Sequence, residues 1–467
     1  MINVIQHSRV SPPPGAVANQ FLPLTFFDLM WIPIPPVQKL LFYDFHHSKS
    51  HFTDSLIPLL KHTLSLTLKH FFPLASNLIL PSSSSSNPSK PEIRYVDGDS
   101  VSLTFAESSN DYNYLTGNQP RNADQFSPLV PKLMQEVYTN KVVVPLAALQ
   151  VTLFPESAGI CFGFNYHHVL ADGKAFQGFM KAWASITKFG SDAELLAGGY
   201  LPFCDRTMIR DRIGVEKTFL SQVCGHEIKH EDLRHQTSNN NVRAMFVIAR
   251  TDVQRLKELV MARPTIPLHV STFTVTCAYM WVCSLKSRAS TKLNDKDVDD
   301  DELEHFVFPM DCRERLDPPI LATYFGNCIT FCFATARHSQ LMEEEEGFFV
   351  AAKSIGEAIA TKVHNGEPDG VLKGLETWLS QIGSLKMDRV RSIAGSPKLR
   401  HYEPDFGWGR PQKNEIVSID RTGFFSMSEC RDSQGDVEFG VCYPKITMDA
   451  FASIFVHGLK LLSVPVR

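Results

Sequence analysis

The stretch Tyr166-His167-His168-Val169-Leu170-Ala171-Asp172-Gly173 follows directly on an apolar run, Gly159–Tyr166, that is rich in β-forming residues. The apolar run predicts a central strand, which places His168 at its exit. After Asp172 comes a helical pattern whose apolar face is formed by Ala175, Phe176, Phe179, Met180, Ala182 and Trp183. Such strand-to-helix junctions carry the chemistry of α/β proteins, and an imidazole there suits a general base. We therefore predict an α/β enzyme.

Bulk composition limits the possible classes of protein. A chain of 467 residues predicts two domains or two lobes, and 43% hydrophobic against 21% charged residues predicts a large folded core. The formal charge of −4 lacks the basic excess of a nucleic-acid-binding protein. We expect a monomer that binds no nucleic acid.

The first residues and the cysteines indicate the compartment. Met1–Gly15 contains His7, Arg9 and three prolines where a secretory signal has a continuous apolar stretch. No apolar run reaches transmembrane length. Ten cysteines without a C-x-x-C pair predict reduced thiols and no metal site. The expected location is the cytoplasm, without membrane contact, metal or permanently bound cofactor.

Residues 205–241 form a long polar stretch without clear periodicity, which suggests a connection between domains. We predict an N-terminal lobe over residues 1–205, a crossover linker over 206–241 and a C-terminal lobe over 242–467. Two further segments, Pro81–Pro91 and the acidic Thr291–Glu304, are predicted to be solvated loops.

Two elements are predicted just after the linker. Arg243–Arg250 has the pattern of a strand, and Val270–Trp281 has that of a buried helix with small polar residues on one side. Among the latter, Ser271 and Thr272 are candidates for binding substrate.

Other chemistries were weighed against a catalytic His168. With 17 histidines, about one His-x-x-x-Asp arises by chance, and His401 with Asp405 forms a second case that we interpret as structural because Pro404 lies between them. A metal site would need a third ligand, and a serine hydrolase a Gly-x-Ser-x-Gly elbow that the chain lacks. For His168 alone, a structural and a catalytic role remain equally open.

Four motifs in order resemble the plant BAHD acyltransferases over essentially the whole chain. They are Leu22–Asp28, His168-Val169-Leu170-Ala171-Asp172, Tyr324-Phe325-Gly326-Asn327-Cys328 and Asp405-Phe406-Gly407-Trp408-Gly409. The first is similar to the opening strand of that family. The third is similar to the branch that acylates anthocyanin, flavonoid and other phenolic glucosides. The resemblance implies two lobes of chloramphenicol-acetyltransferase-like fold with a channel at their interface and His168 midway along it.

The resemblance also implies a mechanism and a set of structural residues. Acyl-coenzyme A would be the co-substrate, a phenolic glycoside the acceptor, and His168 the general base that takes the proton of the acceptor hydroxyl. Asp172 would pair with Arg313 instead of orienting the imidazole. Asp405, the first residue of its motif, is grouped with His168 as a candidate catalytic residue, although the role that the resemblance implies for it is structural. Gly407 and Gly409 would form a tight turn, and Trp408 would pack.

Three further positions concern substrate binding. Ser396 stands where one branch of the family has a tryptophan that donates a hydrogen bond to the oxyanion, and Thr25 resembles a residue facing the catalytic histidine. Lys181 stands where several malonyl-transferring relatives have an arginine that meets the malonyl carboxylate. It is equally well explained as a solvated lysine. The donor is therefore malonyl or hydroxycinnamoyl, with a slight preference for malonyl.

Two alternative functions were considered. The string His167–Gly173 also matches a condensation domain of a peptide synthetase, which would require fused carrier and adenylation domains and does not account for Asp405–Gly409. A catalytically silent binding protein of the same fold is disfavoured because both His168 and Asp172 are present.

Overall fold

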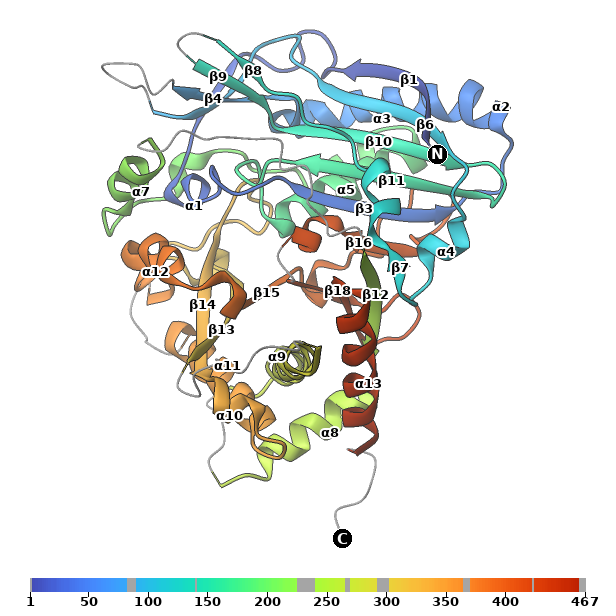
Figure 1. The fold of residues 1–467 in the computed structure, drawn as a ribbon. Coiled ribbons are helices and arrows are strands. Elements are labelled where there is room, and N and C mark those ends of the chain that lie inside the picture. Colours follow the sequence, from blue (N-terminus) through green and yellow to red (C-terminus); the bar gives the residue numbers. More distant parts are fainter. Residues whose placement is uncertain are drawn as a thin grey trace.

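The computed structural model describes residues 2–81, 90–138, 141–224, 240–264, 269–291, 302–363, 370–421 and 424–461. In Figure 1 these residues form an upper half, mostly from the first part of the chain, and a lower half, mostly from the last part. Most of the two predicted solvated loops, and residues 225–239 of the predicted linker, lie outside the described residues.

A six-stranded sheet forms the upper half. Its strand order is β1 (Ile2–Val10), β6 (Val101–Ser108), β10 (Ala147–Phe154), β11 (Gly159–Tyr166), β3 (Val37–Asp44) and β16 (Lys413–Ile416). Strand β11 is buried along its whole length and pairs antiparallel with β10 and β3, so the predicted central strand is confirmed.

Two helices, α3 (Ile57–His70) and α5 (Gly173–Phe189), pack against each other and against this sheet (Figure 1). Trp183 of α5 joins the layers, since its indole meets Phe162 of β11 at 5.6 Å between centroids and donates to Thr63 Oγ1 of α3 at 3.3 Å. The predicted apolar face of α5 is thus the face that it buries.

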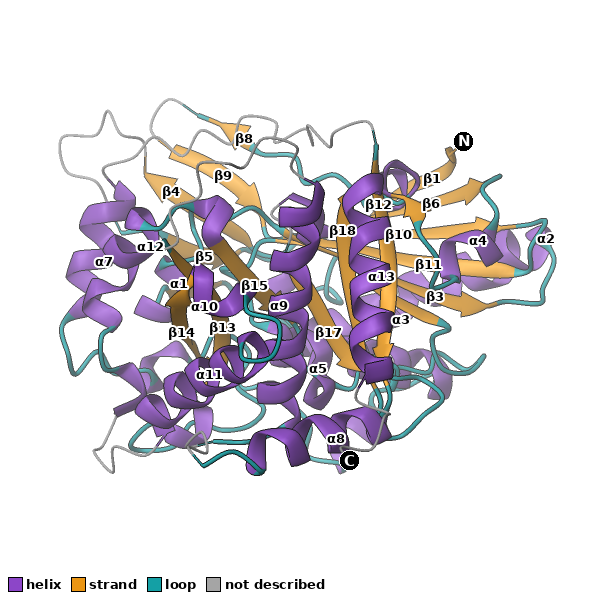
Figure 2. Ribbon diagram, turned by 60° about the horizontal axis from the view of Figure 1, so that its bottom comes forward, coloured by secondary structure: helices purple, strands orange, loops and turns teal. Residues whose placement is uncertain are grey.

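A seven-stranded sheet forms the lower half. Its strand order is β14 (Ile329–Arg337), β13 (Leu303–Asp311), β15 (Val390–Ala394), β17 (Phe425–Glu429), β18 (Val437–Pro444), β12 (Asn241–Ile248) and β7 (Arg121–Asn122). Figure 2 shows α9 (Thr272–Thr291) between α11 (Gly347–Val363) and α13 (Lys445–Leu461), which it contacts. Strand β12 and the buried helix α9 confirm the two elements predicted after the linker.

The two large sheets exchange edge strands. Strand β16 comes from the last part of the chain and pairs with β3, whereas β7 comes from the first part and pairs with β12. Buried ion pairs join the exchanged strands, because Glu415 of β16 meets Arg121 of β7 at 2.7 Å and Arg243 of β12 at 2.9 Å. Removing three charges from water is tolerated only when they are paired in this way.

A third sheet has the strand order β2 (Gln20–Pro23), β5 (Glu92–Tyr95), β4 (Asn77–Pro81), β9 (Lys141–Pro145) and β8 (Glu136–Val137). The remaining α-helices of the described ranges are α1 (Phe26–Leu29), α2 (Lys49–His51), α4 (Tyr112–Thr116), α6 (Ala193–Ala197), α7 (Val215–Cys224), α8 (Arg250–Met261), α10 (His338–Met342) and α12 (Trp378–Ser384). None of the helices in the described ranges has the length and apolar character needed to cross a membrane.

Two local predictions differ from the structure. The segment Leu22–Asp28 is not one strand: β2 ends at Pro23, and α1 begins at Phe26 because Thr25 and Asp28 form a capping box. Within the predicted linker, α7 is a regular helix that contacts α1. The placing of the domain division at residues 206–241 stays a prediction.

Candidate active site

His168 lies in the short connection between β11 and α5, and its side chain keeps part of its surface exposed. The connection is held at its start, where His167 N–H donates to the Leu146 carbonyl oxygen at 2.9 Å and Leu170 N–H donates to the His167 carbonyl oxygen at the same distance. The imidazole is therefore carried by a backbone that strand pairing and a tight turn both fix.

Asn327 determines which nitrogen of His168 carries the proton. Its amide nitrogen Nδ2 lies 2.9 Å from Asp28 Oδ1 and 2.8 Å from the His168 carbonyl oxygen, and both of these oxygens can only accept. The amide oxygen Oδ1 consequently faces His168 Nδ1, at 3.1 Å. Nδ1 must donate this hydrogen bond, so the lone pair of the neutral ring is on Nε2.

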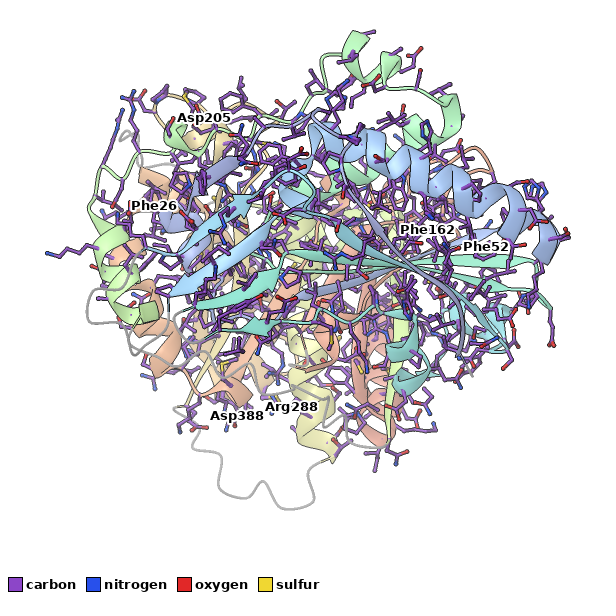
Figure 3. All side chains as sticks on the ribbon, turned by 90° about the horizontal axis from the view of Figure 1, so that it is seen from above. Phe26, Phe52, Phe162, Asp205, Arg288 and Asp388 are labelled. Atoms are coloured by element: carbon purple, nitrogen blue, oxygen red, sulfur yellow. The ribbon has the colours of Figure 1, made fainter. Side chains whose placement is uncertain are left out.

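Asp28 is itself held by a buried arginine. Arg206 forms an ion pair with Asp28, both side chains are fully buried, and Arg206 also donates to the Leu170 carbonyl oxygen at 3.1 Å. Figure 3 shows Phe26, at the start of α1, and Asp205, which precedes Arg206, on the same side of the molecule. The contacts of Arg206 therefore link α1, the connection between β11 and α5 that carries His168, and the residues just after Asp205.

An indole lies against the face of the His168 ring. The Trp31 and His168 ring centroids are 3.6 Å apart and the planes are 11° from parallel. Trp31 in turn meets Phe331 at 5.6 Å, and Phe331 stacks on Trp378 at 4.8 Å. The backbone N–H of Trp31 donates to the Asp28 carbonyl oxygen at 3.0 Å, so Asp28 and Trp31 lie on the same turn of the chain.

The surroundings keep His168 neutral. Burial lowers the pKa of His168 to about 4, against the opposing effect of the Asp172 charge and of the hydrogen bond with Asn327. A base has to be unprotonated to act, so an imidazole of this pKa is ready to accept a proton throughout the neutral range.

Asp172 points away from the imidazole and binds Arg313. Arg313 Nη1 lies 2.9 Å from Asp172 Oδ2 and Nη2 lies 3.1 Å from Oδ1, a two-point ion pair in which both side chains are buried. Asp172 also accepts the N–H groups of Ala175 and Cys328, each at 3.0 Å. It therefore caps α5 and ties the helix to the Tyr324–Cys328 motif.

Asp405 shapes the turn that follows it. Its Oδ1 accepts the N–H groups of Gly407 and Gly409, both at 2.9 Å, and its Oδ2 accepts Lys188 Nζ at 2.7 Å. The two glycines have φ values of 112° and 102°, which favour glycine. Trp408 packs edge-on against Tyr43 at 6.4 Å between ring centroids. These contacts support a structural role for Asp405.

The predicted oxyanion donors already take part in local caps. Thr25 Oγ1 donates to Asp28 Oδ2 at 2.7 Å, which uses its only hydroxyl proton. Ser396 Oγ accepts the Lys398 N–H at 3.2 Å and keeps its own proton for donation. Of these two side chains, Thr25 already donates its hydroxyl proton, whereas Ser396 is seen only as an acceptor in the described part of the chain.

The other predicted substrate-binding residues lie on two helices. On α5, Lys181 forms an ion pair with Glu403, with 40% of the lysine side chain exposed. At the start of α9, Ser271 Oγ lies 2.9 Å from Thr274 Oγ1, and the Thr272 carbonyl oxygen accepts Thr276 Oγ1. Within the described part of the chain, these three residues make no hydrogen bond or ion pair with His168, and their roles stay predictions.

The second His-x-x-x-Asp histidine is enclosed. His401 is 4% exposed, and its Nδ1 lies 2.8 Å from Nζ of the buried Lys39. Burial and the neighbouring lysines hold the pKa of His401 well below its usual range. A ring in contact with a buried lysine is a structural element, as the sequence analysis expects.

Three residues of the site were missed by the sequence analysis. Asn327 belongs to a motif that was noted, and only its hydrogen bonds show what it does. Asp28 was visible as the fourth residue of a Thr-x-x-Asp cap, but its ion pair with Arg206 joins positions far apart in the chain. The stacking of Trp31 on His168 has no signal in the sequence.

Comparison with known proteins fits this site. A family model described as the Transferase family matches residues 1–457. The chain belongs to this family, its resemblance to the BAHD acyltransferases is confirmed, and it is an acyltransferase. Vinorine synthase has the same fold, with a TM-score of 0.65, 18% identity and 96% of each chain covered, which confirms the predicted α/β architecture.

Three curated relatives cover almost the whole chain. A malonyl-coenzyme A:anthocyanin 3-O-glucoside-6''-O-malonyltransferase of Dahlia pinnata is 42% identical, over 98% of both chains. Phenolic glucoside malonyltransferase 1 of Nicotiana tabacum is 41% identical, over 99% of this chain and 100% of its own. A coumaroyl-CoA:anthocyanidin 3-O-glucoside-6''-O-coumaroyltransferase of Arabidopsis thaliana is 37% identical, over 98% and 97%.

Proposed function

We propose that the protein transfers an acyl group from an acyl-coenzyme A to a sugar hydroxyl of a phenolic glucoside, with His168 as general base. The observation that carries this proposal is the Asn327 contact, which places the proton of the neutral imidazole on Nδ1 and leaves Nε2 free to accept another. The relatives are named for acyl transfer to anthocyanin, anthocyanidin or phenolic glucosides.

The reaction follows from this tautomer. Nε2 takes the proton of the acceptor hydroxyl while the hydroxyl oxygen attacks the thioester carbonyl carbon. The resulting tetrahedral oxyanion collapses by breaking the carbon–sulfur bond, and the imidazolium returns the proton to the coenzyme A thiolate. No side chain needs to be acylated. Ser396 is our candidate donor to the oxyanion, since its hydroxyl proton is available.

The donor that we propose is malonyl-coenzyme A, with coumaroyl-coenzyme A as the alternative. Two of the three relatives are named malonyltransferases and have the higher identities, 42% and 41% against 37%. Lys181 supports an acidic acyl group, because its ammonium is partly exposed and its partner Glu403 is also exposed, at 38%. A malonyl carboxylate would take the place of Glu403 on this lysine.

The proposal is tested by incubating the protein with malonyl-, coumaroyl- and caffeoyl-coenzyme A and a set of flavonoid and simple phenolic glucosides. The mass added to the acceptor identifies the donor. We expect His168→Ala to remove almost all transfer, leaving only a slow residual rate, and to keep the thermal unfolding midpoint near that of the unchanged protein. Substantial transfer by His168→Ala would exclude His168 as the base, and products acylated on the aglycone would exclude a sugar hydroxyl as the acceptor.

A further inference from the structure

Trp31 and His168 are stacked face to face, which no motif of the sequence analysis anticipates. At 3.6 Å between centroids and 11° between planes, the rings are in van der Waals contact over one whole face of the imidazole. The indole packs in turn against Phe331, and the backbone N–H of Trp31 donates to the Asp28 carbonyl oxygen at 3.0 Å. The backbone of Trp31 is therefore fixed on the turn that carries Asp28, while its indole is positioned by ring packing.

The stack complements the hydrogen bond from Asn327. That hydrogen bond fixes the position of Nδ1 relative to Asn327 Oδ1, at 3.1 Å. By itself it still allows the imidazole plane to tilt about the Nδ1···Oδ1 line. An indole against one face removes this tilt. The Nε2 edge is then presented in one orientation, and a base fixed in orientation loses less entropy on reaching the transition state.

The stack also stabilises a positive charge on the His168 ring. The face of an indole carries negative electrostatic potential and attracts a cation lying over it. Neutral imidazole gains little from this attraction, whereas imidazolium gains more. Since His168 becomes imidazolium only as the acceptor proton is transferred, the attraction favours the transition state over the ground state.

Two carboxylates near His168 act against the larger effect of burial, because their charges raise its pKa. Asp28 and Asp172 are the carboxylates that act on its ionisation, and each is paired with a buried arginine, Arg206 and Arg313 respectively. The indole face is thus a further source of negative potential, in direct contact with the ring.

We propose that Trp31 is a positioning residue of the acyl transfer, whose indole holds the plane of the His168 imidazole and stabilises the positive charge that this ring acquires. The inference rests on the proposed role of His168 as the base. It predicts that Trp31 acts on kcat through His168 and not on the binding of either substrate.

The test compares Trp31→Leu, which keeps an apolar side chain without a π face, with Trp31→Phe, which keeps an aromatic ring. We expect Trp31→Leu to lower kcat by about 10- to 30-fold, the loss of a desolvated cation–π contact, with both KM values within about twofold. Trp31→Phe should keep kcat within about threefold, because its ring also has a negative face. Trp378→Leu is the matched control, since Trp378 stacks on Phe331 instead of on His168.

A double-variant cycle separates action through His168 from other roles. In a His168→Ala background, Trp31→Leu should cause no further loss of the residual rate, because the ring on which it acts is gone. A further loss there would overturn the proposal. A raised acceptor KM with unchanged kcat in Trp31→Leu would also overturn the proposal, because Trp31 would then be a substrate-binding surface. An equal loss of kcat in Trp31→Phe and Trp378→Leu would overturn it as well, because Trp31 would then be a packing residue.

The failure of this inference is distinguishable from the failure of the proposed function. High activity of His168→Ala would remove the base and the inference with it. An inactive His168→Ala together with unaffected Trp31 variants would remove only the inference. Indole fluorescence gives a readout that needs no turnover. Introducing His168→Gln into the otherwise unchanged protein should change its tryptophan emission. Introducing the same substitution into Trp31→Phe should leave the tryptophan emission of that variant unaltered. A like change in Trp31→Phe would show that the rings are not stacked.

Discussion

At the scale of single residues, His168 is defined by two contacts of different kinds. Asn327 sets the tautomer through a hydrogen bond in the plane of the ring, and Trp31 covers one face. Burial sets the ionisation, since it lowers the pKa of His168 to about 4. Together they describe an imidazole that is neutral and held in one orientation, as the proposed general base has to be.

The first prediction concerns the pH dependence of the reaction. The proposed base acts unprotonated and its pKa is lowered to about 4, so log kcat/KM should stay level from neutral pH downwards and begin to fall only near pH 4. The measurement is the initial rate of acyl transfer between pH 3.5 and 8. Enzyme returned to pH 7 after each incubation must regain full activity, which controls for unfolding. An inflection near pH 6.5 would show that the ring is solvated instead.

The second prediction concerns Lys181, whose ammonium is paired with Glu403. If Lys181 receives the malonyl carboxylate, Lys181→Met should raise the KM for malonyl-coenzyme A about tenfold and hardly change that for coumaroyl-coenzyme A. Glu403→Gln removes a competing carboxylate and should lower the malonyl KM. Both constants come from initial rates at varied donor concentration.

Lys188 provides the control for this prediction. It lies on the same helix, two turns further on, and is paired with Asp405 at a similar exposure, 41% against 40%. Lys188→Met should leave the KM ratio of the two donors unchanged. Equal effects of Lys181→Met on both donors would make Lys181 an ordinary surface residue.

At the scale of elements, α5 begins at a residue that serves two structural purposes. Asp172 caps the helix by accepting the Ala175 N–H. It also forms an ion pair with Arg313, whose guanidinium donates to carbonyl oxygens of the Tyr324–Cys328 motif. The sequence signal at this position was the His-x-x-x-Asp motif, which suggests a catalytic pair. The structure confirms the alternative contact with Arg313, because the carboxylate lies among donors that are far away in the chain.

The third prediction follows from this dual use. Asp172→Ala should lower the free energy of unfolding by about 3–5 kcal/mol, because it leaves the Arg313 charge buried without its closest partner. Arg313→Ala should have a similar effect. The measurement is equilibrium unfolding in urea. Asp311→Ala is the control, since Asp311 also contacts Arg313 but is 37% exposed, and its loss should be clearly smaller. If Asp172→Ala unfolds like the unchanged protein, the ion pair is unimportant for stability.

At the scale of the whole molecule, the two large sheets are joined by exchanged edge strands. Strand β16 completes the sheet that carries His168, although it lies after the Asp405–Gly409 motif in the chain. Strand β7 completes the other sheet. Glu415 connects the two exchanges by its contacts with Arg121 and Arg243. The halves therefore share edges as well as a site.

The fourth prediction is that Glu415→Gln destabilises both halves together. Two buried arginines would lose a charged partner, at a cost of about 3–5 kcal/mol in the free energy of unfolding. Urea unfolding followed by far-ultraviolet circular dichroism and by tryptophan fluorescence should shift equally with both probes. Glu357→Gln, from the exposed helical pair with Lys353, should hardly move the midpoint. Transitions that separate between the probes would show that the exchange does not couple the halves.

The same residue makes stability depend on pH. Burial alone would raise the pKa of Glu415, but Arg121 and Arg243 outweigh it and lower this pKa to about 2. A carboxyl whose pKa falls on folding stabilises the fold above its unfolded pKa, about 4.3, and loses this contribution as the pH falls towards 2. The acid destabilisation of the unchanged protein should therefore exceed that of Glu415→Gln in this range.

The sequence by itself determined several local elements and the family, and it singled out His168 as a candidate. Strand β11, the apolar face of α5 and the buried helix α9 follow from periodicity, because burial on one face imposes a repeat that neighbours in the chain can show. Motif order identified His168 and the family. The capping box at Thr25 was also encoded locally, although it was overlooked in favour of a longer strand.

Only the tertiary structure decided what surrounds His168. Trp31 and Asn327 both lie more than a hundred residues from His168 in the chain, and the ion pair of Asp28 with Arg206 likewise joins residues more than a hundred positions apart. The exchange of β7 and β16 is of the same kind. A stack, a tautomer or a buried ion pair depends on distances between remote segments, and such distances leave no periodic trace along the chain.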